Sequence, residues 1–359
     1  MPKIKDIAAA LKADLTGDGE ITVEGINHPA AAGARDLALA LEESALSALG
    51  ESAAPAAIVM RGAETPARLR AVIAVDFPRY AMATLTRLFA GEPHKTTGIH
   101  PTAVIDPSAV IEDSVSIGPF VAIGPGARIG RATVILPHVT IAAHARIGAE
   151  CLLHPGVRIG ERVEIGDRVI LHHNCSIGAD GFSFAIPEPG SPPPPGDPRI
   201  SRIASLGTVI LGPDVEVGAN SCIDRGTIEA TSVGAGTKID NLVMIAHNNQ
   251  IGEGCLIAGR VGVSGSCRIG NRVILAGGVG IADHVTIGDD AVVLAGAQVG
   301  SSRIAPGAVV IGMPAMAKDK FFEQVRYMFR LKRLFADVAE IKSRLGPTKP
   351  EPAKAGDES

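Results

Sequence analysis

The chain has 359 residues, a formal net charge of −4, no Trp and only 3% aromatic residues. Its length suits two or three structural units, and its acidic balance, without a basic aromatic motif, argues against nucleic-acid binding. No apolar run reaches the roughly 18 residues of a membrane helix, so we expect a cytoplasmic protein without stable membrane insertion.

Residues 1–98 carry no repeat and are expected to form a small α/β domain. The chain starts with the pattern of an amphipathic helix rather than that of a signal peptide. We predict helical segments at Ile4–Ala13 and Asp36–Leu49, and strands at Ala56–Met60 and Arg70–Val75.

From Ile99 to Ile177, every sixth residue is Ile or Leu, at fourteen consecutive positions, twelve of them Ile. A helix repeats every 3.6 residues and a strand every 2, so neither produces this pattern. The period is typical of a hexapeptide β-solenoid, in which three short strands close one coil and the inward Ile residues stack from coil to coil. We therefore predict a mainly β fold, a left-handed parallel β-helix spanning residues 99–313.

The repeat changes register twice. A short register comprises Leu211, Val217 and Ile223, and a longer one runs from Val233 through Ile239 and Ile245 to Ala305 and Ile311. Between the first two registers, residues 184–203 are rich in Pro and are predicted to leave the prism as a loop. The whole repeat corresponds to about ten or eleven coils.

From residue 314 the period becomes helical, which predicts C-terminal α-helices over residues 314–346 with one apolar face. The last residues, 347–359, are expected to be disordered. The five Cys lack CxxC spacing, and four of them lie two residues before an inward Ile or Leu, so packing explains them better than disulfides or zinc.

Several His residues occupy outward positions of the coils, where a surface role is the simpler interpretation: His138, His144, His154, His172 and His173. His154 and His172 are eighteen residues apart and should stack, but no third ligand at a suitable spacing is evident. We therefore predict neither a metal nor another cofactor.

His247 and His284 are better candidates for chemistry. They are thirty-seven residues apart, two coils plus one residue, which places them near one edge of the prism. Polar residues surround His247 in the segment KIDNLVMIAHNNQIG, and a carboxylate beside a His can raise its basicity. From the residues alone, a general base and a surface His remain equally good interpretations.

Three segments carry a resemblance to a known family: IGADGFSFA from Ile177, CIDRGTI from Cys222 and IDNLVMIAHNNQIG from Ile239. They resemble the UDP-3-O-acylglucosamine N-acyltransferases of lipid A biosynthesis, as do VGVSGSCRIG and GIADHVTIG further along. The similarity extends from about Val72 onward, and the DRG and IAHN segments are its specific part.

This resemblance implies a homotrimer with active sites in the clefts between prisms. It implies transfer of an R-3-hydroxyacyl chain from acyl carrier protein to the 2-amino group of UDP-3-O-(3-hydroxyacyl)glucosamine. His247 would be the general base, Asp240 would orient it, His284 would assist, and the Gly265 N–H would stabilise the oxyanion. The other residues of the matching segments would bind substrate: Asn241, Asn248, Asp224 and Arg225.

Segment 318–344 has eight Lys or Arg against four acids. Because acyl carrier proteins are acidic, this helix is a candidate dock for the carrier, and packing in a trimeric bundle is the alternative. The docking candidates are Lys320, Arg326, Arg330 and Arg333.

The N-terminal domain departs from the family pattern. The family holds uracil between aromatic side chains, whereas no aromatic residue precedes Phe77 in this chain. Two alternatives therefore stay open: a related enzyme that acylates another amino-sugar nucleotide, possibly with acyl-CoA, and a trimeric scaffold without activity.

Overall fold

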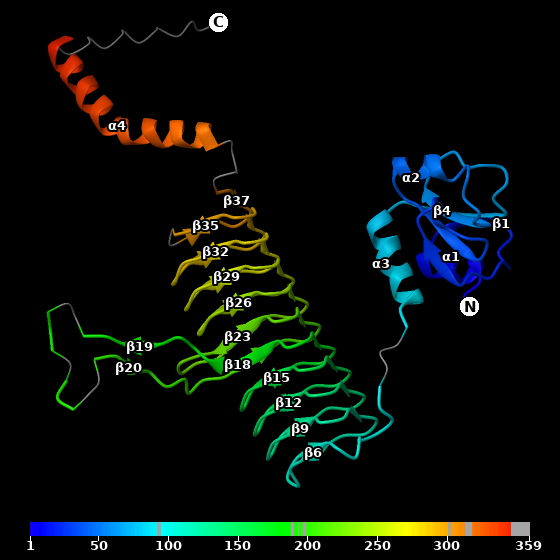
Figure 1. Cartoon of the computed structure of the whole chain (residues 1–359), viewed down its shortest axis with the longest axis horizontal. Coiled ribbons are helices and arrows are strands. Elements are labelled where there is room, and N and C mark those ends of the chain that lie inside the picture. The colour runs from blue at the N-terminus through cyan, green and yellow to red at the C-terminus, as the bar shows by residue number, and fades with distance from the viewer. Residues whose placement is uncertain are drawn as a thin grey trace, which may run out of the picture. The chain divides into compact units, whose positions relative to one another are not determined.

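The computed structural model describes residues 1–91, 95–187, 190–192, 194–196, 199–300, 303–312 and 318–345. Figure 1 shows an α/β unit, a stack of short strands and a C-terminal helix. By their internal contacts they form two compact units, Met1–His94 and Lys95–Ser359. Each unit is described by itself.

The first unit is a five-stranded sheet in the order β1-β5-β4-β3-β2, with β1 antiparallel and the other strands parallel. Its core is aliphatic and includes Ile7, Leu37, Ile58 and Ile73. The expected α/β domain is thus confirmed. In chain order its elements are α1 (Ile4–Leu11), β1 (Asp14–Gly17), β2 (Gly25–Asn27), β3 (Asp36–Ala40), α2 (Glu43–Ala48), β4 (Ala56–Met60), β5 (Ala71–Val75) and α3 (Pro78–Phe89).

The helix predicted over Asp36–Leu49 is present only in the second half of this range. Asp36–Leu49 was expected to be helical because Ala and Leu favour helices, but its first part forms β3 and only Glu43–Ala48 is helical. β3 lies between β2 and β4, and Leu37 and Ala38 are fully buried there. Burial in the sheet outweighs the local propensity.

The second unit is a parallel β-solenoid, as the hexapeptide period predicted. Three ten-stranded sheets form its faces, so ten rungs are stacked. Following the chain, each rung passes from face I to face II and then to face III.

Face I contains β6 (Val104–Ile105), β9 (Ala122–Ile123), β12 (Thr140–Ile141), β15 (Arg158–Ile159), β18 (Ser176–Asp180), β23 (Cys222–Arg225), β26 (Met244–Ile245), β29 (Gly262–Val263), β32 (Gly280–Ile281) and β35 (Gln298–Val299). Face II contains β7 (Val110–Ile111), β10 (Arg128–Ile129), β13 (Arg146–Ile147), β16 (Glu164–Ile165), β21 (Val209–Leu211), β24 (Thr231–Val233), β27 (Gln250–Ile251), β30 (Arg268–Ile269), β33 (Thr286–Ile287) and β36 (Arg303–Ile304). Face III contains β8 (Ser116–Ile117), β11 (Val134–Ile135), β14 (Leu152–Leu153), β17 (Ile170–Leu171), β22 (Glu216–Val217), β25 (Lys238–Ile239), β28 (Leu256–Ile257), β31 (Ile274–Leu275), β34 (Val292–Val293) and β37 (Val309–Val310).

The core of the solenoid is the column of inward residues that defines the period. Ile129 pairs with Ile147, which pairs with Ile165, and all three are buried. Four Cys are buried in this core, Cys151, Cys175, Cys255 and Cys267, which fits their predicted packing role, and Cys222 is partly exposed.

The last coil departs from the predicted register. Ile287 pairs with Ile304, seventeen residues on, so Ile304 and Val310 take the positions expected for Ala305 and Ile311. Ile304 is buried whereas Ile311 is 69% exposed. The coil is one residue short between Val299 and Ile304, and a slip of one residue moves each side chain to the other side of a strand.

The Pro-rich insertion leaves the prism where face I turns to face II. Part of it forms a two-stranded antiparallel ribbon, β19 (Phe184–Ala185) with β20 (Ser201–Arg202), rather than only a loop. Figure 1 shows this ribbon projecting from the stack next to β18 and β23.

The C-terminal part contains one helix in the described residues, α4 (Lys318–Leu345), where several were expected. The helix has no buried residue, so its apolar face is uncovered within one chain. The expected disordered tail, 347–359, lies outside the described residues. Within the described ranges, no helix is long and apolar enough to cross a membrane.

Candidate functional site

Edge I/II, where face I turns to face II, brings together most of the predicted catalytic residues. His247 follows β26, Gly265 follows β29 and His284 follows β32, on three consecutive rungs. The backbone links them, since Ser266 N–H donates to His247 C=O (3.0 Å) and His284 N–H donates to Gly265 C=O (3.1 Å). The spacing of two coils plus one residue therefore places both His on one edge.

The His247 ring lies against two glycines. A Cβ built on Gly181 would lie 2.7 Å from its Cδ2, and one built on Gly265 would lie 2.9 Å from its Cε1. Such approaches are closer than side chains tolerate, so glycine at both positions leaves the room that the ring occupies. Gly181 stands at the root of the projecting ribbon, which connects the insertion to the site.

Asn248 fixes the tautomer of His247. Its Oδ1 lies 2.9 Å from His247 Nδ1 and also accepts hydrogen bonds from the N–H and hydroxyl of Thr227, both at 3.1 Å. Because a carbonyl oxygen only accepts, Nδ1 carries the proton and donates it to Asn248. Nε2 therefore keeps its lone pair, as a general base requires.

Asp224 is the acidic group whose charge interacts with His247. It lies at the end of β23 and is only 5% exposed. Burial raises the pKa of Asp224 to about 6, against the opposing effect of the His247 charge. The charges of the two side chains are therefore coupled.

Asp240 does not make the contact with His247 that the resemblance implied, because the two lie on different edges of one chain. Asp240 follows β25 on face III, and its Oδ1 accepts from Asn241 N–H at 2.7 Å. Among the described residues, the hydrogen-bond partner of the His247 ring is Asn248.

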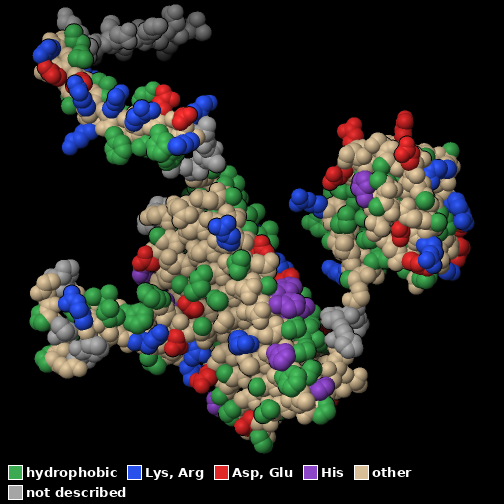
Figure 2. Space-filling view, in the orientation of Figure 1, with side chains coloured by type: hydrophobic (Ala, Val, Ile, Leu, Met, Phe, Trp, Pro, Cys, Tyr) green, Lys and Arg blue, Asp and Glu red, His purple; other side chains and the backbone are tan. Residues whose placement is uncertain are grey.

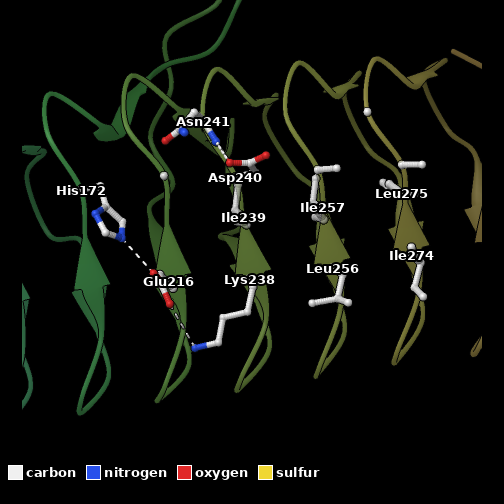
Figure 3. Close-up of a pocket in the computed structure, with 14 residues that line it drawn as sticks. His172, Glu216, Lys238, Ile239, Asp240, Asn241, Leu256, Ile257, Ile274 and Leu275 are labelled. Carbon is white, nitrogen blue, oxygen red and sulfur yellow. Dashed lines mark hydrogen bonds and ion pairs between the residues drawn. The ribbon is translucent and has the colours of Figure 1, made fainter. Parts of the chain in front are cut away.

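Asp240 and Asn241 instead line a pocket of about 700 Å³ over face III (Figure 3). Leu256 and Ile274 form its apolar part. A chain of polar contacts bounds its other end: His172 Nε2 lies 2.8 Å from Glu216 Oε1, and Lys238 Nζ lies 3.7 Å from Glu216 Oε2. The predicted site residues are therefore divided between two edges.

A second groove, of about 530 Å³, lies on face I next to His247. Gly262 and Gly280 stand at outward positions of β29 and β32, where other rungs carry side chains, with Met244 on one side and Gln298 on the other. A Cβ on Gly262 would meet no atom within 4 Å, whereas one on Gly280 would clash with the side-chain amide of Gln298. The open space that a linear chain could occupy therefore lies over Gly262.

Arg225 has structural contacts rather than an open position for substrate. Its side chain is buried, and its guanidinium donates to the carbonyls of Gly178 and Glu161, both at 2.9 Å. It ties three rungs of the prism together beneath the site.

His173 is a residue whose significance the sequence reasoning missed. One ring nitrogen from each of His154, His172 and His173 lies within 4.8 Å of the other two. The third potential ligand, which the sequence did not reveal, is therefore the residue next to His172. The sequence feature that could have indicated this group is the adjacent pair His172 and His173 at a corner of the coil. Two successive residues of a turn can both point outward, so both rings can approach His154.

The basic residues of α4 follow the helix along its length, as Figure 2 shows. Arg326 Nε donates to Phe322 C=O at 3.3 Å, and Arg333 lies 3.9 Å from Asp337. We call the four docking candidates the α4 cation set: Lys320, Arg326, Arg330 and Arg333.

Phe77 and Tyr80 form the exposed aromatic pair of the first unit, 70% and 78% exposed, with ring centroids 6.3 Å apart. They border a pocket of about 310 Å³ at the carboxyl end of β5, together with Lys12 and Asp76. Ligands of open parallel sheets bind at this end of the strands.

The chain is similar to known acyltransferases. Residues 108–143 and 144–179 match the model of the bacterial transferase hexapeptide (six repeats). A UDP-3-O-acylglucosamine N-acyltransferase of Ruegeria pomeroyi is 45% identical over 362 residues, 98% of this chain and 99% of that protein. The protein of the same name from Paracoccus denitrificans is 50% identical over 262 residues, 69% of this chain and 71% of that protein.

Solved structures show the same fold. The Arabidopsis UDP-N-acetylglucosamine acyltransferase matches with a TM-score of 0.54 and 21% identity, over 71% of this chain and 86% of that one. At this identity the likeness concerns the fold alone.

Proposed function

This chain belongs to the UDP-3-O-acylglucosamine N-acyltransferase family, and we propose that it transfers a 3-hydroxyacyl chain from acyl carrier protein to the 2-amino group of UDP-3-O-(3-hydroxyacyl)glucosamine. The observation that carries the proposal is the His247 ring, held between two glycines with Nδ1–H on Asn248 and Nε2 free. An apolar groove lies beside it.

The chemistry needs one base and one oxyanion donor. His247 Nε2 takes a proton as the amine attacks the thioester carbon, the C–N bond forms, and the carbonyl oxygen becomes an oxyanion. The Gly265 N–H, which has no hydrogen-bond partner in the described part of the chain, stabilises that oxyanion. When the tetrahedral intermediate collapses, the C–S bond breaks and the His247 imidazolium protonates the leaving thiolate. The charge of Asp224 interacts with that of His247, and His284 contacts the substrate two rungs away.

The acyl chain occupies the groove at Gly262, where glycine removes the side chain that would fill it. The side chain of Gln298 covers Gly280 and bounds the groove on that side. The uridine is held at the carboxyl end of β5, where Phe77 and Tyr80 replace the aromatic pair that the family has elsewhere.

The enzyme acts as a homotrimer in which Asp240 and Asn241 of one copy face His247 of the next. Two observations support this. Asp240 and His247 lie on different edges of one chain, and no residue of α4 is buried, so the apolar face of this helix is left exposed in a single chain. The pocket over face III then supplies the second wall of each cleft.

The acyl transfer is tested with the purified chain, UDP-3-O-(3-hydroxyacyl)glucosamine and 3-hydroxyacyl carrier protein, with the product followed by mass spectrometry. We expect the diacylated sugar nucleotide from the wild type, and its formation about 10²- to 10⁴-fold more slowly by His247→Ala. Product formed only from an acyl-CoA, or only with another amino-sugar nucleotide, would favour the related activity instead.

The shared site is tested by mixing two inactive variants, His247→Ala and Asp240→Asn, and reassembling the trimers. If the groups come from neighbouring copies, about a quarter of the sites in random trimers combine two intact residues. If both groups act within one chain, no site is restored and the mixture stays inactive.

A further inference from the structure

Three imidazoles meet on edge III/I, where face III turns to face I. His154 follows β14, and His172 and His173 follow β17, so two neighbouring rungs contribute. The ring centroids of His154 and His172 are 4.9 Å apart, and those of His154 and His173 are 4.8 Å apart. The proposed acyl transfer gives none of these three residues a chemical role, although His172 borders the pocket over face III.

The separation of the nitrogens suits a metal ion. One ring nitrogen from each residue lies within 4.8 Å of the other two, so some point lies within about 2.8 Å (4.8 divided by √3) of all three. A Zn–N bond is about 2.0–2.1 Å long. Small rotations of the rings supply the remaining difference, and the exposed His173 has the freedom to make them.

A carboxylate stands behind one of the imidazoles. Glu216 Oε1 lies 2.8 Å from His172 Nε2. When Nε2–H donates to this carboxylate, Nδ1 of His172 keeps the lone pair that a metal requires. A metal-bound His is commonly oriented by a carboxylate in this way.

From this geometry we propose that His154, His172 and His173 bind a divalent transition-metal ion, with Glu216 as the orienting carboxylate. Imidazole ligands favour Zn²⁺, Co²⁺, Ni²⁺ and Cu²⁺ over Mg²⁺ and Ca²⁺, which prefer oxygen. Three protein ligands leave a fourth tetrahedral position for water or for a group bound in the adjoining pocket, which His172 also lines. The ion would clamp two rungs together on this edge.

The test uses the full chain, with any affinity tag removed and after dialysis against a chelator. Zn²⁺ is titrated by calorimetry, and Co²⁺ is titrated in parallel because a tetrahedral site gives strong visible absorption. We expect one ion per chain and a Kd in the micromolar range or below. His173→Asn should weaken binding at least about 10-fold, and Glu216→Gln should weaken it about 10-fold.

His144→Asn is the matched control. It makes the same substitution at another corner, where φ is +58°, a conformation that Asn tolerates. Its affinity for Zn²⁺ should equal that of the wild type. The melting temperature of each variant in chelator establishes that it is folded, and Glu216→Gln provides a second reading should His173→Asn fail to fold.

Two results would overturn the proposal: no Zn²⁺ binding by the wild type, or an equal loss in His173→Asn and His144→Asn, which would indicate scattered surface binding. Because the readout is metal affinity, neither result depends on the acyltransferase activity.

Discussion

Replacing Gly265 by Ala should displace the His247 ring without removing any functional group. The added Cβ would lie 2.9 Å from Cε1 and 3.2 Å from Nε2, whereas unbonded carbons settle at about 3.5–4.0 Å. The ring must therefore move by about 0.6–1 Å. A misplacement of about 1 Å can cost 10²-fold in rate, so we expect kcat to fall about 10- to 100-fold. Ala keeps the backbone N–H, so the oxyanion donor remains.

The assay is steady-state acyl transfer by wild type, Gly265→Ala, His247→Ala and the double variant, with melting temperatures as a folding control. Gly181→Ala is an independent probe, since its Cβ would lie 2.7 Å from His247 Cδ2. In the His247→Ala background no ring remains to be displaced, so Gly265→Ala should have no further effect. An equal fold-loss in both backgrounds would refute the displacement argument.

Three further predictions concern the groove, the buried acid and the helix. Gly262→Met should fill the groove over face I and lower kcat/KM for donors with a long acyl chain, while donors with a short chain still react. An equal loss of kcat/KM for long and short donors would contradict the proposed position of the acyl chain. Burial raises the pKa of Asp224 to about 6, above its unfolded value of about 3.9, so the stability from the bound proton is present below about pH 3.9 and lost as the pH rises through 6. Asp224→Asn should therefore stabilise the protein relative to wild type by about 2 kcal/mol more at pH 7.5 than at pH 4.5. A gap in melting temperature that is constant with pH would exclude this effect. Replacing the α4 cation set by Glu should raise the KM for acyl carrier protein and reduce its salt dependence while leaving kcat unchanged, whereas a fall in kcat alone would speak against docking at α4.

The repeat could be predicted from the sequence because every sixth residue is an aliphatic side chain buried in the core. Where a local choice depends on distant residues, prediction failed: β3 looks helical until Leu37 and Ala38 are seen buried between two strands. The short last coil could not be predicted because Ala305 and Ile311 continue the six-residue period from Val299. Nothing in the sequence pattern indicated that Ile304 and Val310 would point inward instead.

The site was predictable as an edge but not as a set of contacts. Spacing alone placed His247 and His284 on one edge of the prism. It could not show that Asn248 rather than Asp240 holds the His247 ring. Whether the side chains of two adjacent residues meet depends on the backbone conformation of the turn, which the spacing does not reveal. His173 was missed for the same reason.

The short last coil also shows what holds such a stack in register. The spacing from β35 to β36 is one residue short, yet β35, β36 and β37 pair in parallel with β32, β33 and β34 of the regular rung before them. The Pro-rich insertion is the opposite case, because β18 and β23 pair although a long segment leaves the prism between them. The strands therefore set the register, and the corner between face I and face II can lose or gain residues without breaking the stack. Such a corner is where a prism of this kind can acquire new segments.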